Sequence, residues 1–487
     1  MNRTRWSTAA LAAGLVVGGC LAGAPAVAAG DGPLAPFHHQ RIAWHGCQRG
    51  PQDTDGQALD EAGAQCADVT VPLDYARPGR RTITVALSRL RATDTAHRIG
   101  AMVINLGGPG IPVLPIVPLA RAAAGQTGAR FDLIGLDQRF TGRSSPLDCD
   151  WPESWISRSA GTDRRSFDRA VARSRDLARR CAQRHGDLLP YASTANAARD
   201  MDVVRAALGE PKLSYLGYSY GSYLGALYTQ MFPARSDRFV LDSAIDPAHP
   251  GTFKGRDNGP FREAALGGQL STVDAIYRAA ARHPLRVGRY LVDETVVPAL
   301  VLDPLTDDSP ASAAALADTV RVLATAAAGG TVEPTPEMAA TLAGTLTGSG
   351  SALHSAQTAI MCVDGAVPRD PEFYWRDIQR HRTEAPLFGP LDRNITPCAF
   401  WPTGPVEPQI RVHNAVPALV VNAAGDIGAT IGMGRAMHAA LTGSRMITLD
   451  GVRTHGVYLF RGNGCVDDSV NAYLNTGVLP GADLTCD

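Results

Sequence analysis

Lysine is nearly absent from this chain of 487 residues, in which Lys212 and Lys254 are the only two. Lysine and arginine together number 46 against 47 acidic residues, so the formal net charge is −1. Binding to nucleic acid or to an anionic membrane relies on an excess of basic charge, and none is present. Hydrophobic residues make up 45% and charged residues 19%, which is typical of a folded globular protein. We therefore expect no nucleic-acid partner.

Motifs for metals and phosphates are also missing. The sequence has no Cys-x-x-Cys, no His-Glu-x-x-His and no tight cluster of cysteine and histidine, the patterns that hold zinc. A glycine-rich stretch at residues 105–110 lacks the Gly-Lys-Ser/Thr sequel of a phosphate-binding loop. We expect neither a metal nor a cofactor.

The N-terminus has an apolar run, residues 7–19, that is too short to span a bilayer, which takes about 20 residues. Arg3 and Arg5 precede this run, and small residues ending in Ala-Val-Ala-Ala follow it. This layout predicts a secretory signal peptide over residues 1–29, and hence a secreted protein with no integral membrane span. Val-Gly-Gly-Cys20 partly resembles a lipoprotein box, so a lipid anchor at Cys20 on the cell surface is the alternative.

Eight of the nine cysteines follow the signal region, and an even set in an exported chain suggests disulfides. Eight cysteines allow 105 pairings, and the sequence alone cannot choose among them. They fall into four neighbouring couples, and we expect local pairing. The expected bonds are Cys47–Cys66, Cys149–Cys181, Cys362–Cys398 and Cys465–Cys486.

Short runs rich in Val, Ile and Leu, bounded by Gly, Pro or Asp, are typical of strands that are buried on both faces. Helical patterns such as 197–208 alternate with some of them, which predicts a parallel sheet with helices on both faces. The expected strands are 67–72, 82–90, 101–105, 131–137, 213–218, 239–242, 418–422 and 446–449.

Between residues 246 and 407 the pattern becomes Ala-rich and helical, with helices expected at 311–328, 336–346 and 373–382. We interpret residues 246–407 as an inserted helical cap, or lid. The main core would then consist of residues 30–245 and 408–487. The alternative is that the inserted segment completes the main core.

The sharpest chemical signal is Gly217-Tyr218-Ser219-Tyr220-Gly221, which follows an apolar strand and precedes a helical run at 223–231. In that setting Gly-x-Ser-x-Gly is a nucleophile elbow, which exposes the serine hydroxyl on a tight turn at the head of a helix. The sequence therefore predicts Ser219 as a nucleophile.

A serine nucleophile needs a base and a group that orients the base, in the chain order Ser, Asp or Glu, His. Asp426 follows one late strand and His455 follows the next, so both are expected at the carboxyl edge of the sheet. His438 lies in an expected helix and is better interpreted as a surface or packing residue. Asp450 is the nearest competitor of Asp426.

An acyl-transfer site also needs N–H donors for the oxyanion. Asn105-Leu106-Gly107-Gly108-Pro109-Gly110 follows an early strand, and its glycines would let backbone N–H groups face a reacting carbonyl. The first donor is expected at Gly107 or Gly108, and the second is the N–H of Tyr220, one residue past the nucleophile.

These motifs together resemble the secreted tripeptidyl-aminopeptidase branch of the prolyl-iminopeptidase-like α/β-hydrolases of actinomycetes, over nearly all of the mature chain. The resemblance implies an α/β-hydrolase fold with a helical cap, a triad of Ser219, Asp426 and His455, and release of short peptides from free N-termini. The matching stretches are residues 66–75, the Gly-Gly-Pro-Gly loop, residues 141–144, residues 216–222 and the tail 465–486.

The chain departs from that family near the expected site. Family members usually have small residues where this chain has Ile111-Pro112-Val113 and Pro-Arg-Gly where it has Gln138-Arg139-Phe140. Further departures are Leu106 in place of proline, residues 427–430 in place of Pro-x-Thr, and a cysteine pair missing around residues 277–286. The altered residues suggest a changed pocket wall.

Three functions remain open. The first is an aminopeptidase acting on short peptides, with Asp364 as the candidate anchor for the substrate amine, although Asp364 could equally be structural. The second is an esterase, lactonase or amidase for a small apolar substrate, which Ile111, Val113 and Phe140 favour. The third is a non-catalytic binding protein, against which the complete set of catalytic residues argues.

Overall fold

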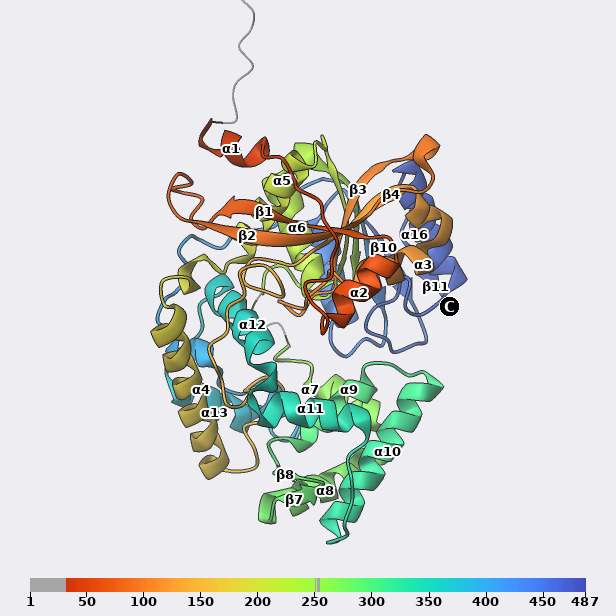
Figure 1. Cartoon of the computed structure of the whole chain (residues 1–487). Coiled ribbons are helices and arrows are strands. Elements are labelled where there is room, and N and C mark those ends of the chain that lie inside the picture. The colour runs from red at the N-terminus through yellow and green to blue at the C-terminus, as the bar shows by residue number, and fades with distance from the viewer. Residues whose placement is uncertain (1–31, 250, 252–254) are drawn as a thin grey trace, which may run out of the picture.

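The computed structural model describes residues 32–249, 251 and 255–487 (Figure 1). The predicted signal peptide and Cys20 lie outside the described residues. Among the helices of the described part, none is both long enough and apolar enough to cross a membrane.

A nine-stranded sheet forms the centre of the upper half of the molecule in Figure 1. Its order is β1-β2-β4-β3-β5-β6-β9-β10-β11; β1 and β2 pair antiparallel, as do β2 and β4, and all later pairs are parallel. The α/β fold with a mostly parallel sheet is therefore confirmed. The strands are β1 (Gln65–Pro72), β2 (Thr82–Leu90), β3 (Gly100–Asn105), β4 (Phe131–Leu136), β5 (Leu213–Tyr218), β6 (Ser236–Asp242), β9 (Ala418–Ala423), β10 (Arg445–Leu449) and β11 (Leu484–Cys486).

Successive side chains of a strand point to opposite faces of the sheet, and both faces of the parallel strands are buried. Val420 faces one apolar cluster, which includes residues of α5 (Thr194–Ala207), α6 (Tyr220–Met231) and α15 (Ile431–Ala440). Leu419 and Val421 face a second cluster, which includes residues of α3 (Ile116–Ala129) and α16 (Gly464–Thr476). Helices therefore cover both faces, as the continuous apolar runs predicted.

In the described residues between β6 and β9, no strand joins this sheet. This part of the chain forms helices and one small hairpin, most of which lie in the lower half of Figure 1, and an apolar cluster there includes Val273, Val297 and Leu323. The elements are α7 (Gly259–Leu266), α8 (Leu270–Arg282), β7 (Leu285–Val287), β8 (Tyr290–Val292), α9 (Val297–Leu305), α10 (Pro310–Ala327), α11 (Pro336–Leu346), α12 (Ser351–Asp364), α13 (Pro371–His381) and α14 (Gly389–Asp392). We continue to call residues 246–407 the cap segment.

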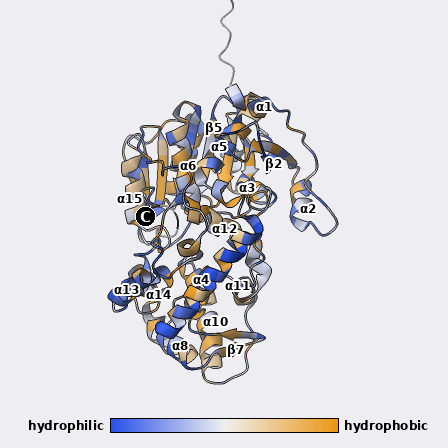
Figure 2. Ribbon diagram, turned by 90° about the vertical axis from the view of Figure 1, so that its left-hand side faces the viewer, coloured by the Kyte–Doolittle hydropathy of each residue, from blue (hydrophilic) through white to orange (hydrophobic). Residues whose placement is uncertain are grey.

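A helix from before the nucleophile also lies on the cap side. Helix α4 (Arg164–His185) runs beside α13 in Figure 1, and its Phe167 and Ala170 pack with Tyr374 and Ile378 of α13. Hydrophilic and hydrophobic residues alternate along it in Figure 2, as expected of a helix with one buried stripe. The lower half of the molecule therefore draws on two separate stretches of chain.

Four disulfides join neighbouring cysteines, and each ties a peripheral segment to the fold. Cys465–Cys486 links α16 to the edge strand β11, and Cys362–Cys398 links α12 to the turn at Pro397–Phe400 within the cap segment. The other two bonds are Cys47–Cys66 and Cys149–Cys181.

Candidate active site

Ser219 occupies the sharp turn between β5 and α6, with φ 55° and ψ −123°. Its backbone N–H donates to the carbonyl of Asp242 at 3.0 Å, which fixes the turn to the end of β6. The flanking glycines are required by close approach: a Cβ at Gly221 would lie 2.7 Å from the carbonyl oxygen of Asn105, and one at Gly217 would lie 2.5 Å from that of Gly221. The strained serine at a helix head has the geometry of a nucleophile elbow.

Asp426 and His455 meet at the same edge of the sheet. Asp426 follows β9, and its Oδ2 lies 2.9 Å from Nδ1 of His455, which follows β10. The Asp426 side chain is fully buried, and its Oδ1 accepts the N–H groups of Gly428 at 2.7 Å and Ala429 at 3.0 Å. The imidazole is 31% exposed, so one face of the pair is open. A carboxylate held in this way can orient a histidine base.

The two competitors identified from the sequence lie elsewhere. His438 sits in α15, where its Nδ1 contacts Ser444 Oγ at 2.7 Å and its Nε2 pairs with Asp483 at 3.3 Å. Asp450 is exposed, and its backbone N–H pairs with the carbonyl of Cys486. Their described contacts are therefore those of structural residues at the β10–β11 edge.

The loop after β3 lies against the nucleophile. A Cβ at Gly107, where φ is 93°, would come within 2.6 Å of the Tyr218 carbonyl oxygen and 3.0 Å of Ser219 Cβ. The Gly107 N–H donates to the Asn105 side chain at 2.9 Å, so this amide is already engaged within the loop. Gly107 and Gly108 both remain candidates for the first oxyanion donor.

Helix α12 of the cap segment lies over that loop and reaches the base of α6. Near its middle, the Gln357 backbone N would be 3.4 Å from a Cβ at Gly110. At its C-terminal end, Asp364 accepts the N–H of Thr194 at 2.8 Å and also its hydroxyl, so it caps α5. Burial, and then the charge of Asp364, raise the pKa of Tyr220, whose hydroxyl contacts Thr194. Asp364 is therefore a helix cap next to the residue that follows the nucleophile.

The residues expected to alter the pocket wall divide into two groups. Ile111 is 38% exposed and remains a wall candidate. Val113 and Phe140 are 0% and 1% exposed, and Phe140 packs in the apolar core, so these two side chains do not face a pocket. Arg139 is also fully buried, in a salt bridge with Asp200. The expectation that Val113 and Phe140 face an open pocket is wrong, because both side chains are buried.

The loop that follows His455 has an anchor that sequence reasoning missed. Asp242, at the end of β6, is fully buried and accepts the N–H groups of Val457 at 3.0 Å and Tyr458 at 2.8 Å. The Ser243 hydroxyl accepts the N–H of Gly456 at 2.7 Å and donates to Asp242 at 3.1 Å. An acid that ends a buried strand was the available signal, but the sequence does not show which loop it would hold.

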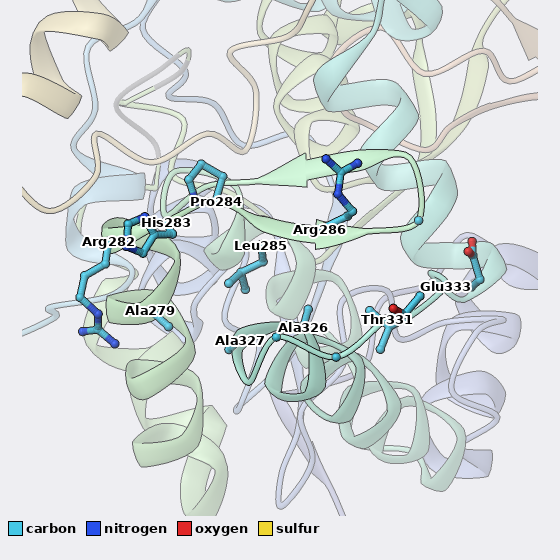
Figure 3. Close-up of a pocket in the computed structure, with 14 residues that line it drawn as sticks. Ala279, Arg282, His283, Pro284, Leu285, Arg286, Ala326, Ala327, Thr331 and Glu333 are labelled. Carbon is cyan, nitrogen blue, oxygen red and sulfur yellow. The ribbon is translucent and has the colours of Figure 1, made fainter.

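One cavity adjoins the candidate site, and another lies away from it. One of 510 Å³ lies behind the acid and is lined by Phe261 of α7 together with Asp426 and Arg453. Another, also of 510 Å³, lies between α8, the β7–β8 hairpin and α10, lined by alanines with Arg282, His283 and Glu333 (Figure 3). The second contains none of the candidate catalytic residues. Within the described residues, no group of three or more His, Cys, Asp or Glu side chains is arranged to hold a metal ion.

The nucleophile elbow, the parallel sheet and the carboxylate–histidine pair define an α/β-hydrolase. A sequence profile described as "alpha/beta hydrolase fold" matches residues 100–268, and one described as "TAP-like protein" matches residues 385–486. The chain belongs to the tripeptidyl-aminopeptidase-like family of α/β-hydrolases and is a hydrolase enzyme, as the motifs predicted.

Three relatives support this family assignment. The tripeptidyl aminopeptidase of Streptomyces coelicolor is 32% identical over 87% of this chain and 83% of its own length. The serine protease Hip1 of Mycobacterium tuberculosis is 30% identical over 98% of this chain and 96% of its own. A protein of Mycobacterium tuberculosis named carboxylesterase B is 32% identical over 100% and 99%.

Proposed function

We propose that the protein is an exported aminopeptidase that releases short peptides from free N-termini through an acyl-enzyme on Ser219. The observation that carries the proposal is the 2.9 Å contact between His455 and Asp426 at the sheet edge that also holds the Ser219 turn. Relatives named as peptidases support the peptide substrate.

The mechanism follows from the geometry. The hydroxyl of Ser219 attacks the scissile carbonyl and passes its proton to Nε2 of His455, while Asp426 holds the Nδ1–H. The N–H group of Tyr220, together with that of Gly107 or Gly108, stabilises the oxyanion. The histidine then returns the proton to the leaving amine, and water releases the acyl group by the reverse route.

Recognition of a free amine requires an acidic group, and we assign it to Asp364. Helix α12 carries this carboxylate from the cap segment to the base of α6, next to Tyr220. The two hydrogen bonds from Thr194 hold the carboxylate in place. A charged hydrogen bond to an ammonium contributes about 1.5–3 kcal/mol, which corresponds to roughly 10- to 150-fold in kcat/KM.

Export is supported by the cysteines and the N-terminus. All eight cysteines after residue 20 are paired in disulfides, which persist in oxidising compartments. The predicted signal peptide agrees with that location. A lipid anchor at Cys20 would leave the same enzyme attached to the cell surface.

An esterase is the second candidate. A relative named carboxylesterase B matches the entire chain, and the exposed Ile111 next to the Gly108 loop could contact an apolar acyl group. With Val113 and Phe140 buried, Ile111 alone supports this alternative among the three altered residues.

A comparison of three substrates separates the two candidates: a free tripeptide anilide, its N-acetyl form, and a short-chain ester. An aminopeptidase should hydrolyse the free anilide at least about tenfold better, in kcat/KM, than the acetylated one. Cleavage of both anilides at equal rates would refute the aminopeptidase, and turnover of the ester alone would establish the esterase.

Variants localise the amine site. Asp364→Asn should lower kcat/KM for the free anilide about tenfold or more and leave the acetylated anilide and the ester nearly unchanged. Asp370→Asn is the matched control, because Asp370 also caps a helix, α13, in the cap segment. Equal losses on all substrates for Asp364→Asn would show that the residue serves only as a helix cap.

A further inference from the structure

The short turn after His455 is held by groups from two neighbouring strands. From β6, Asp242 accepts two consecutive backbone N–H groups, one on each carboxylate oxygen, and Ser243 accepts a third from Gly456. From β5, the Tyr218 hydroxyl donates to the carbonyl of Tyr458 at 2.8 Å. Three successive residues after the histidine are thus fixed to the ends of β5 and β6.

The same strand ends also hold the nucleophile. The backbone carbonyl of Asp242 accepts the N–H of Ser219, while its side chain holds the turn after His455. One residue therefore sets the position of the serine turn relative to the histidine turn. We propose that Asp242 is a positioning residue for the hydrolytic reaction, which keeps the imidazole of His455 aligned with Ser219.

The chemistry of the Asp242 site requires an ionised carboxylate. Val457 N–H and Ser243 O–H donate to Oδ1, and Tyr458 N–H donates to Oδ2, so each oxygen faces at least one donor. A proton or an amide NH₂ on either oxygen would face a donor instead of an acceptor. Loss of the charge would therefore release part of the turn.

Burial opposes this ionised state. Full burial raises the pKa of Asp242 to about 7, although Tyr458, Val457 and Ser243 donate to the carboxylate and the charge of His455 favours its ionised form. The titratable groups coupled to it are His455 on the turn and Tyr218 on β5, whose own pKa lies well above 10 because of burial and then the Asp242 charge. Near neutral pH, the carboxylate of Asp242 can therefore change its charge beside the turn that follows His455.

The test rests on the proposed roles of Ser219 and His455 and uses the full-length mature protein. Asp242→Asn should lower kcat about 10- to 100-fold with little change in KM, since small misalignments of reacting groups have effects of this size. The acid limb of the pH profile, followed by the rate of fluorophosphonate labelling, should move to lower pH. The reason is that the imidazolium loses a nearby negative charge.

Asp237→Asn is the matched control, because Asp237 lies near the opposite end of β6. It should leave kcat and the pH profile unchanged. A folded Asp242→Asn variant with wild-type kcat and an unmoved acid limb would overturn the proposal. If that variant does not fold, Ser243→Ala decides: a lower kcat at unchanged KM supports positioning of the turn, and an unchanged kcat refutes it.

A failure of the catalytic assignment gives a different pattern. If Ser219→Ala is still labelled and active, the proposed nucleophile is wrong whatever Asp242 does. If Ser219→Ala is silent while Asp242→Asn matches the wild type, only the positioning role fails.

Discussion

Replacing Asp426 by asparagine tests how the proposed triad depends on its acid. The carboxylate accepts three hydrogen bonds, from Gly428, Ala429 and His455. An amide has only one oxygen. The two backbone N–H groups that donate to Oδ1 will keep that oxygen in the Oδ1 position. The NH₂ group then faces Nδ1 of His455, which must give up its proton and become an acceptor.

In that tautomer the proton lies on Nε2, so the imidazole cannot accept the proton of Ser219. A change of the histidine tautomer of this kind lowers kcat by about 10⁴-fold in a Ser-His-Asp triad, which is equivalent to roughly 5 kcal/mol of transition-state stabilisation. Because asparagine has the same shape, and both backbone bonds to Oδ1 persist, the free energy of unfolding should change far less than the activation barrier.

The measurement is kcat for a chromogenic ester and a peptide anilide, together with the rate of fluorophosphonate labelling at Ser219. Asp450→Asn is the matched control, and its kcat should stay within about twofold of the wild type. Asp450 is exposed, and the proposed triad does not include it. The reasoning is refuted if Asp426→Asn keeps more than about a tenth of the wild-type kcat. It is also refuted if the two variants lose activity equally.

Three further outcomes are expected. Ser219→Ala should lose turnover and fluorophosphonate labelling without unfolding; labelling at another residue with activity intact would disprove the nucleophile. His455→Ala should lose at least about 10²–10⁴-fold in kcat, while His438→Ala should lose little, and the reverse result would mean that the base is misplaced. Peptide mapping without reduction should recover four disulfides, and free thiols at these positions would count against the pairing and against export: Cys47–Cys66, Cys149–Cys181, Cys362–Cys398 and Cys465–Cys486.

Elements whose signal is local were predictable from the sequence. The eight expected strands are present within a few residues of their expected bounds, because most of them are buried apolar runs between turn residues. The helix expected at residues 336–346 has those bounds in the structure, where Thr335 caps it and Pro336 begins it. Strand β11, of only three residues, was missed because its pairing with β10 depends on tertiary contact.

Features that depend on the direction of a side chain were not predictable. Phe140 and Val113 differ from the family pattern near the site, yet the structure buries both. Asp242 looked like an ordinary strand end, and its role depends on a turn more than 200 residues later in the chain. Contacts between distant segments are set by topology, which a pattern of residue types does not encode.

The placement of the cap segment between β6 and β9 bears on how such enzymes can diversify. These two strands are adjacent in the sheet, with Asp242 opposite Val421, so the cap segment leaves and re-enters the sheet at neighbouring positions. The entropy of closing a chain segment grows only with the logarithm of its length, about 0.6 kcal/mol for each doubling. Insertions and deletions there can therefore accumulate during evolution at small cost to strand pairing. Such tolerance would produce relatives with different named activities. In these relatives, the catalytic edge of the sheet would be constant and the cap segment would vary.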